Sequence, residues 1–162
     1  MKSISLAVAT VLSGLSAGLL YGWWVSVIPG TRRMSGSSYV ETMQSVNQAI
    51  LNPAFLAVFL GAPVAIAVAG VVTFIDGESL RTVLLVTALL LYLSTTLATT
   101  VRGNIPLNDQ LEQFELSSAT PTAIGDARDA YEGPWNRLHG VRVASSTLAF
   151  ALCVAATLVN VG

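Results

Sequence analysis

Four long windows of the sequence contain no charged residue, and their lengths decide the solvent in which this chain folds. The windows are residues 4–28, 51–75, 82–101 and 143–162, with 25, 25, 20 and 20 residues. An α-helix rises about 1.5 Å per residue and the hydrocarbon core of a bilayer is about 30 Å thick, so about 20 apolar residues can cross it. Each window is therefore predicted to be a membrane-spanning helix.

The alternatives to spanning helices fit the windows poorly. A membrane strand would show alternating polarity over about 10 residues, whereas residues 83–91 read Val-Leu-Leu-Val-Thr-Ala-Leu-Leu-Leu. A secretory signal has an apolar region of about 7–15 residues, and the first window is longer. We expect one all-α integral membrane domain over residues 1–162, a four-transmembrane-helix bundle with one long polar connection between helices 3 and 4. The localisation is multi-pass integral membrane, in the cell membrane if the protein is bacterial.

Composition excludes several other classes of protein. Charged residues make up only 10% of the chain, against about 25% in soluble domains. Eight basic and nine acidic residues leave no basic patch for nucleic acid. Cys153 and His139 are the only residues of their types, so neither an internal disulfide nor a zinc site of four Cys and His ligands can form. We predict no metal and no cofactor.

The positions of the basic residues suggest an orientation. Four crossings place residues 29–50 and 102–142 on one side of the membrane, with six arginines there and two basic residues on the other side. By the positive-inside rule, the side with six lies in the cytoplasm. The six are Arg32, Arg33, Arg102, Arg128, Arg137 and Arg142, and the two are Lys2 and Arg81.

Glycines recur every fourth residue in the first window, at Gly14, Gly18 and Gly22. Small residues with this spacing share one face and let a second helix approach closely. The partner is either a helix of the same chain or a helix of a second copy, which would make a homo-oligomer. Packing within the chain is favoured because three other helices need a contact surface.

The connection of residues 102–142 contains ten of the seventeen charged residues and the sole histidine. A structureless loop of this length is uncommon unless it is functional, and residues 117–121 have the composition of a break between two short helices. Trp135, His139 and Arg142 share one helix face. Pro134 fits the first turn of that helix, which continues into the fourth crossing.

Polar side chains that flank the other crossings are expected to meet this face at one membrane edge. Two readings stay open for them: a polar pocket, or amides that satisfy helix ends beside arginines that anchor at the headgroups. For the pocket, we assign His139, Arg142 and Asn108 to catalysis. The predicted substrate-binding residues are Trp135, Asn104, Arg102, Asn47, Gln44 and Tyr131.

The same residues carry a resemblance that spans nearly the whole chain. The sequence resembles the anthrone oxygenase-like membrane proteins, a family whose members mostly have no assigned function. The matching elements are Pro29-Gly30, Arg33, Met43-Gln44, Asn47, Ile50, Asn52-Pro53, Phe55, Pro106-Leu107-Asn108 and Trp135-Asn136 followed by His139 and Arg142. The resemblance implies a four-helix membrane bundle and, for characterised members, oxidation of an anthrone to an anthraquinone by oxygen without a metal or flavin.

Such a reaction needs a base, a group that stabilises an oxyanion, and a flat apolar pocket. His139 suits the base because an imidazole titrates near neutrality. Arg142, Arg102 or Asn108 would stabilise the oxyanion. Trp135 and Tyr131 would stack on the aromatic substrate.

Two functions of different class follow from this pattern. The first is a cofactor-independent oxygenase or oxidase of lipophilic aromatic, anthrone-like substrates. The alternative is a non-catalytic membrane binding or accessory subunit that docks a partner or a lipophilic ligand at its polar rim. A transporter ranks below both, because such proteins usually carry ionisable residues at mid-membrane depth and all four windows lack them. The expected partners are membrane lipid and a lipophilic aromatic small molecule.

Overall fold

The fold is described by a computed structural model over residues 1–159, and within that range it consists of helices without strands. Four of its helical stretches are long and apolar enough to cross a membrane: Lys2–Thr31, Pro53–Ile75, Ser79–Glu112 and Pro121–Leu158. The all-α class and the four candidate spans are thus confirmed, and they fit an integral membrane protein. The last three residues of the fourth predicted window, 160–162, lie outside the described residues.

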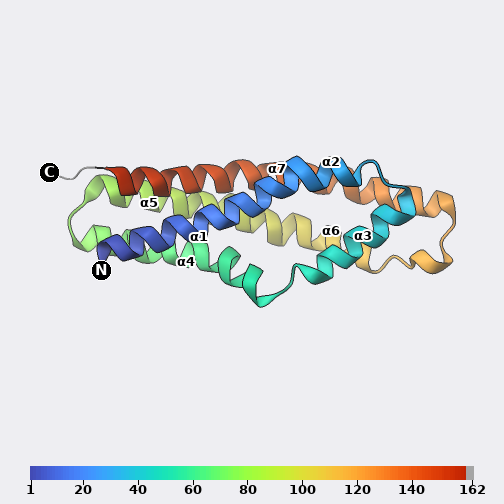
Figure 1. The fold of residues 1–162 in the computed structure, drawn as a ribbon, viewed down its shortest axis with the longest axis horizontal. Helices are drawn as coiled ribbons and strands as arrows, with labels where there is room; N and C mark the ends of the chain where they lie inside the picture. The colour runs from blue at the N-terminus through green and yellow to red at the C-terminus, as the bar shows by residue number, and fades with distance from the viewer. Residues whose placement is uncertain (160–162) are drawn as a thin grey trace.

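Four helices form the membrane bundle: α1 (Lys2–Gly22), α4 (Pro53–Ile75), α5 (Ser79–Leu91) and α7 (Pro121–Leu158). Each of α1 and α5 packs against both α4 and α7, and the beginning of α1 and the end of α7 lie at the same end of the molecule (Figure 1). Small side chains fill much of the interior, so the backbones approach closely without a hydrophobic driving force between helices. The fully buried small residues are Ala9, Ala62, Ala69, Ala88, Ala149, Cys153 and Ala156.

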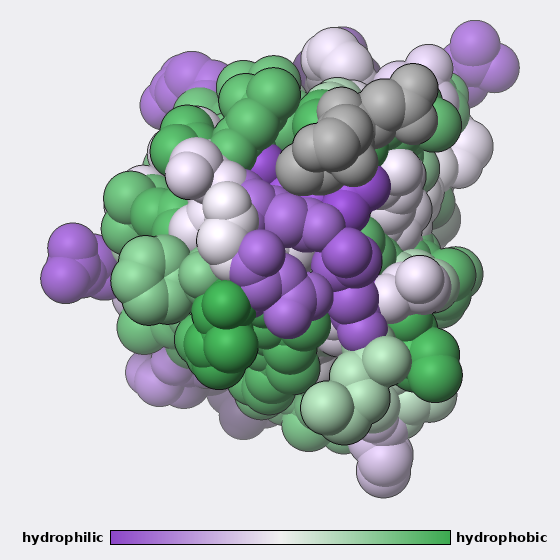
Figure 2. Space-filling model, turned by 90° about the vertical axis from the view of Figure 1, so that its left-hand side faces the viewer, coloured by the Kyte–Doolittle hydropathy of each residue, from purple (hydrophilic) through white to green (hydrophobic). Residues whose placement is uncertain are grey.

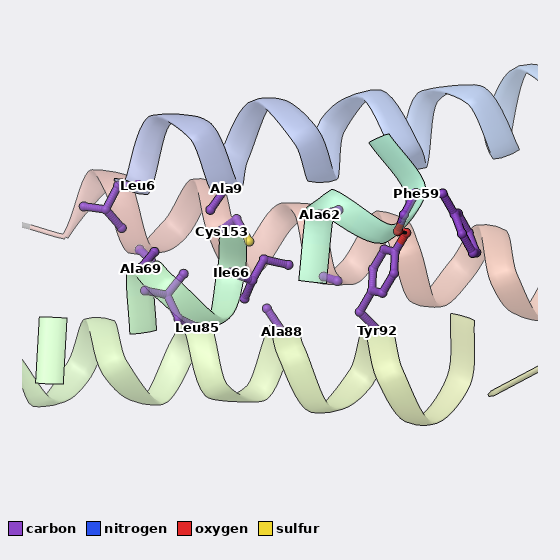
Figure 3. Packing of buried hydrophobic residues seen from close by; sticks show 12 residues of the cluster. Leu6, Ala9, Phe59, Ala62, Ile66, Ala69, Leu85, Ala88, Tyr92 and Cys153 are labelled. Atoms are coloured by element: carbon purple, nitrogen blue, oxygen red, sulfur yellow. Dashed lines mark hydrogen bonds between the residues drawn. The ribbon is translucent and has the colours of Figure 1, made fainter. Parts of the chain in front are cut away.

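One tyrosine joins three of these helices inside the apolar core. Tyr92, at the start of the π-helical segment η2 (Tyr92–Leu97), donates to the Phe59 carbonyl at 2.9 Å and is 2.8 Å from the Ser16 hydroxyl. Its ring lies beside Phe59 within the cluster of Figure 3. Because a polar group in hydrocarbon must be hydrogen-bonded internally, this contact fixes the relative positions of α1, α4 and the third crossing.

The expectation of one long polar connection between helices 3 and 4 is not what the structure has. The third crossing continues without interruption through η3 (Thr100–Asn104) and α6 (Ile105–Glu112), and α7 already begins at Pro121. Only residues 113–120 connect them, with one 3-10 turn, η4 (Leu116–Ser118). Continued helix satisfies the backbone hydrogen bonds that a loop would leave open.

Pro134 therefore lies inside α7 and not in the first turn of a helix, as the sequence suggested. The helix starts instead where Thr120 caps it, since the Thr120 hydroxyl accepts from the Ala123 N–H at 3.3 Å. Pro121 follows at the first position of the helix, where a proline loses no hydrogen bond. A break between two helices was expected at residues 117–121, and the structure has it at residues 113–120.

The helices extend well beyond the thickness of a bilayer. Arg81 and Arg102 are 21 residues apart on the third crossing, which corresponds to about 31 Å and matches a hydrocarbon core of about 30 Å. Residues 121–141 of α7 add about 30 Å more on the Arg102 side. We call this part, with α3 (Gly36–Ala49) and α6, the extramembrane layer.

The extramembrane layer has its own core, separate from that of the bundle. Arg128 of α7 lies at the edge of this core, near the connection between α1 and α3. It donates to the Met34 carbonyl at 2.8 Å, and its guanidinium carbon lies 4.5 Å from the centre of the Tyr39 ring. Burial of Tyr39 raises the pKa of its hydroxyl. The core consists of Ile28, Tyr39, Val40, Met43, Leu111, Tyr131 and Trp135.

Between α3 and α4 the chain leaves the line of both helices, and it protrudes from the rest of the molecule (Figure 1). Asn52 caps α4 by accepting from the Phe55 N–H at 2.9 Å, and Pro53 cannot continue a helix from the residues before it. This break separates a helix of the extramembrane layer from a helix of the bundle. It lies next to the cavity described below.

Of the three glycines in α1, one is used for close packing. A Cβ added to Gly14 would lie 3.0 Å from the Phe150 ring of α7, whereas Gly18 and Gly22 have no neighbour within 4 Å of that position. Packing within the chain thus accounts for Gly14. A homo-oligomer stays a prediction.

Charged residues lie at the end of the bundle where α1 begins and α7 ends. Glu78 is only 7% exposed and pairs with Lys2 and, at 2.7 Å, with Arg81. Arg81 also donates to the carbonyls of Ala156 and Val159 at the end of α7. Figure 2 shows hydrophilic side chains gathered in the middle of this end with hydrophobic side chains around them.

Replacing Glu78 with glutamine should remove a pH-dependent part of the stability. Hydrogen bonds from Lys2 and Arg81 lower the pKa of Glu78 below its ordinary value of 4.5. A carboxyl with a lowered pKa in the folded state stabilises above the unfolded pKa and loses that contribution as the pH falls. We expect Glu78→Gln to lower the Tm of the detergent-solubilised protein at pH ~7, with a difference that shrinks as the pH approaches ~3. Asp76→Asn, at an exposed neighbour, is the control; an equal effect there would contradict the role of Glu78.

Candidate functional site

A cavity of about 340 Å³ lies where the membrane bundle meets the extramembrane layer. Its volume is in the range of small-molecule sites, about 300–1,000 Å³. Most of its wall is apolar and comes from α1, α4 and the third crossing, including Leu20, Trp23, Phe55, Leu56, Phe59 and Leu97. Its polar wall consists of Asn47, Thr100, Asn104, Asn108, Trp135, His139 and Arg142.

Two π-helical segments shape this wall. They are η1 (Trp23–Val27), between α1 and α2 (Ile28–Thr31), and η3 (Thr100–Asn104). π-Helical segments are rare in proteins, and those that occur often lie at functional sites. Here they contribute Trp23 from one helix and Thr100 and Asn104 from another to the cavity.

His139 uses both ring nitrogens in the structure. Arg142 Nη2 lies 2.7 Å from Nδ1, and the Leu20 carbonyl oxygen lies 3.0 Å from Nε2. A guanidinium only donates and a carbonyl only accepts, so Nε2 carries the proton and Nδ1 presents its lone pair to Arg142. The ring is neutral and stacks on Trp135, with centroids 4.8 Å apart and planes 12° apart. Any substrate that uses Nδ1 has to replace Arg142 there.

Arg142 is a buried cation without a carboxylate partner among the described residues. It is 7% exposed and bonds to His139 and, at 3.3 Å, to the Thr100 hydroxyl. Its guanidinium carbon also lies 5.2 Å from the centre of the Trp135 ring, and its Nε has no hydrogen-bond partner. Because an uncompensated buried charge is costly, the site is electrostatically suited to an anionic oxygen.

Asn104 has a buried side-chain oxygen that accepts no hydrogen bond. It is 1% exposed, and its Nδ2 reaches the Trp135 carbonyl at 3.4 Å. Its Oδ1 has no partner, although buried polar atoms are nearly always hydrogen-bonded. Arg142 and Asn104 thus both line the cavity, and each has one buried side-chain atom without a hydrogen-bond partner.

A network of hydrogen bonds holds the outer end of the cavity. Asn108 Oδ1 accepts from Trp135 Nε1 at 2.8 Å and from the Tyr131 hydroxyl at 3.0 Å. Asn47 Nδ2 in turn donates to the Tyr131 oxygen at 3.3 Å. Since Asn47, Asn108 and Trp135 belong to three different helices, this network fixes the orientation of the Trp135 ring.

Six of the nine predicted site residues line the cavity: His139, Arg142, Asn108, Trp135, Asn104 and Asn47. Tyr131 does not line the cavity, but its hydroxyl donates a hydrogen bond to Asn108, which does. Gln44 lies elsewhere and joins α3 to the end of the third crossing by donating to the Leu111 and Phe114 carbonyls. Arg102 is exposed and is not part of the wall.

The sequence pattern did not predict several residues of the cavity wall. Trp23 belongs to a Trp-Trp pair that is equally typical of a membrane interface, and Thr100 lies in a charge-free window. The Leu20 carbonyl is a backbone group that any residue would supply. Among residues 1–159, no three His, Cys, Asp or Glu side chains are grouped so that they could bind a metal ion.

Loss of the Asn108 amide should loosen the site measurably. Asn108→Ala leaves Trp135 Nε1 and the Tyr131 hydroxyl without their acceptor, and an unsatisfied buried group costs about 1–3 kcal/mol. We expect the free energy of unfolding in detergent micelles to fall by about that amount. Asn136→Ala, a half-buried position of α7 without a side-chain hydrogen bond, should change it by less than about 0.5 kcal/mol. Equal losses in the two variants would contradict the network.

Comparison with known proteins adds a family to this geometry. No curated protein and no solved structure matches the chain. The family model described as anthrone oxygenase matches residues 54–152, which is more than half of the chain. That stretch includes the cavity residues of α4, the third crossing and α7, while Asn47 and Trp23 precede it. The chain belongs to the anthrone oxygenase family.

Proposed function

We propose that the protein is a cofactor-independent membrane oxygenase that oxidises a lipophilic, anthrone-like aromatic in the cavity. The observation that carries this proposal is Arg142, a buried guanidinium without a carboxylate, placed beside an apolar wall with aromatic faces. Membership of the family supports the same chemistry. The non-catalytic alternative, a subunit that only binds a lipophilic ligand, is an outcome of the test below.

The reaction balances with molecular oxygen as the only co-reactant. A base removes one proton from the ring CH₂, which leaves an electron-rich enolate. The electron pair forms a C–O bond to oxygen, and the resulting peroxide takes up a proton. Loss of the second C–H proton with cleavage of the O–O bond then gives the ketone and one water. One oxygen molecule is consumed for each CH₂ converted to a carbonyl.

Arg142 and His139 would act as a pair in these steps. When the developing enolate oxygen binds the guanidinium, Arg142 Nη2 can turn from His139 Nδ1 toward it. The Nδ1 lone pair is then free to accept the proton. Nε2 stays bound to the Leu20 carbonyl, 3.0 Å away, so the ring keeps its tautomer and position. Donors arranged in advance for a developing oxyanion typically contribute 10²–10³-fold, or about 2.7–4 kcal/mol.

Other residues of the cavity wall would bind and orient the substrate. Trp23, Phe55 and Phe59 contribute aromatic side chains to the wall, while the Trp135 ring stacks on His139 and on Tyr131. Asn104 Oδ1 is the acceptor for a ring hydroxyl. Asn108, whose oxygen already accepts two hydrogen bonds, would act by holding Trp135 and Tyr131 in place.

Oxygen uptake with a dihydroxyanthrone tests the proposal. Purified protein in detergent should consume oxygen and form anthraquinone in equal amounts, above the spontaneous rate in buffer with detergent alone. Arg142→Gln should lower kcat by about 10²-fold or more, while Arg137→Gln, on the exposed side of the same helix, should leave it unchanged. Binding without turnover by the wild type would favour the non-catalytic alternative.

A second pair of variants separates the base from its structural role. His139→Gln can still accept from Arg142 and donate to Leu20, but it cannot take up a proton. We expect His139→Gln to keep the wild-type Tm within a few degrees and to lose about 10²–10⁴-fold in kcat. His139→Ala should lose both stability and activity. Full activity of His139→Gln would show that His139 positions Arg142 and is not the base.

A further inference from the structure

We infer that the ligand of this cavity is an aromatic that carries an apolar tail, and that the tail leaves the cavity sideways into the bilayer. This inference rests on the proposed site. It adds the class of ligand and the direction from which the ligand arrives. The inference is based on the separation of polar and apolar groups along the cavity.

The most deeply buried polar residues of the wall are Asn104, His139 and Arg142, which are all nearly inaccessible. Asn104 and Arg142 also contain two of the three buried side-chain atoms without a hydrogen-bond partner among the described residues. A polar ligand head bound here would lose water, so it needs these atoms as partners.

The rim of the cavity on the membrane side of Arg102 is apolar and exposed. Val101 is 53% exposed on the third crossing, and Leu60 is 47% exposed on α4; Leu19 and Leu56 are the other exposed apolar residues of the wall on that side. A substrate that arrives from water is expected to meet polar side chains at the mouth of its site. Exposed leucine and valine at this depth contact hydrocarbon instead.

The two ends of the cavity also differ in depth. Asn104 and Asn108 lie beyond Arg102, on the side of the extramembrane layer, whereas Leu97 lies toward the middle of the membrane. From Leu97 to Asn108 the helix rises about 16 Å. A bound molecule would therefore have its polar head at the membrane surface and its apolar part toward the midplane, as any amphipathic lipid has in a bilayer.

Fluorescence quenching in lipid vesicles tests the tail directly. Trp24 does not line this cavity, so Trp24→Phe leaves Trp23 and Trp135 as cavity reporters. The probes are a hydroxynaphthoquinone with a decyl chain, the same ring without the chain, and decanol as the tail alone. Affinities are expressed as mole fraction in the bilayer, so that simple partitioning of the chain into lipid does not count.

Phenylalanine at the rim should discriminate between the probes. We expect Val101→Phe and Leu60→Phe to weaken binding of the decyl compound about tenfold by filling the path of the tail, and to change binding of the tailless ring by less than about twofold. Val83→Phe, a 60% exposed position of the same crossing outside the cavity, should change neither. Decanol should not compete with the tailed ring at equal mole fraction.

Equal effects of the rim variants on both rings, or no effect on either, would overturn the inference. Competition by decanol as strong as that of the tailed ring would show that a lipid chain alone fills the cavity, which also overturns it. The outcomes are separate from those of the oxygenase assay. Tailed binding without oxygen uptake defeats the proposed function and keeps this inference. Oxidation of an anthrone, together with equal effects of the rim variants on the tailed and the tailless ring, does the reverse.

Discussion

The hydrogen bonds that connect Arg142, His139 and the Leu20 carbonyl hold the bundle together where the apolar part of α7 ends. They join α7 to α1, and they fix the protonation of the imidazole at the same time. A guanidinium at this depth is tolerated because His139, Thr100 and the Trp135 face surround it. The neighbouring cavity therefore has in its wall a guanidinium without a carboxylate partner among the described residues.

The cavity exists because the molecule has two layers with different packing. In the bundle, alanines and a cysteine bring the helices close together. In the extramembrane layer, larger side chains such as Tyr39, Tyr131 and Trp135 form the core. The chain changes from one to the other at the break between α3 and α4, while the third crossing and α7 run through both. Space is left at the junction, with exposed apolar side chains on one side and the polar network on the other.

The two ends of the bundle also differ in the partners that their cations have. At the end where α1 begins and α7 ends, Glu78 pairs with both Lys2 and Arg81, and Arg81 also donates to the last carbonyls of α7. Both of these cations thus have a carboxylate partner. At the other end, Arg142 lacks such a partner among the described residues.

The sequence by itself determined the solvent, the four crossings and the helix face that bears Trp135, His139 and Arg142, because helix length and the 3.6-residue period are local properties. It also placed Asn47, Asn104 and Asn108 near that face. Only the tertiary structure decided that the polar connection is helical, that Gln44 bonds to a helix end, and that both nitrogens of His139 are occupied. Those outcomes depend on a distant backbone carbonyl and on π-helical turns, which leave no pattern in the side chains.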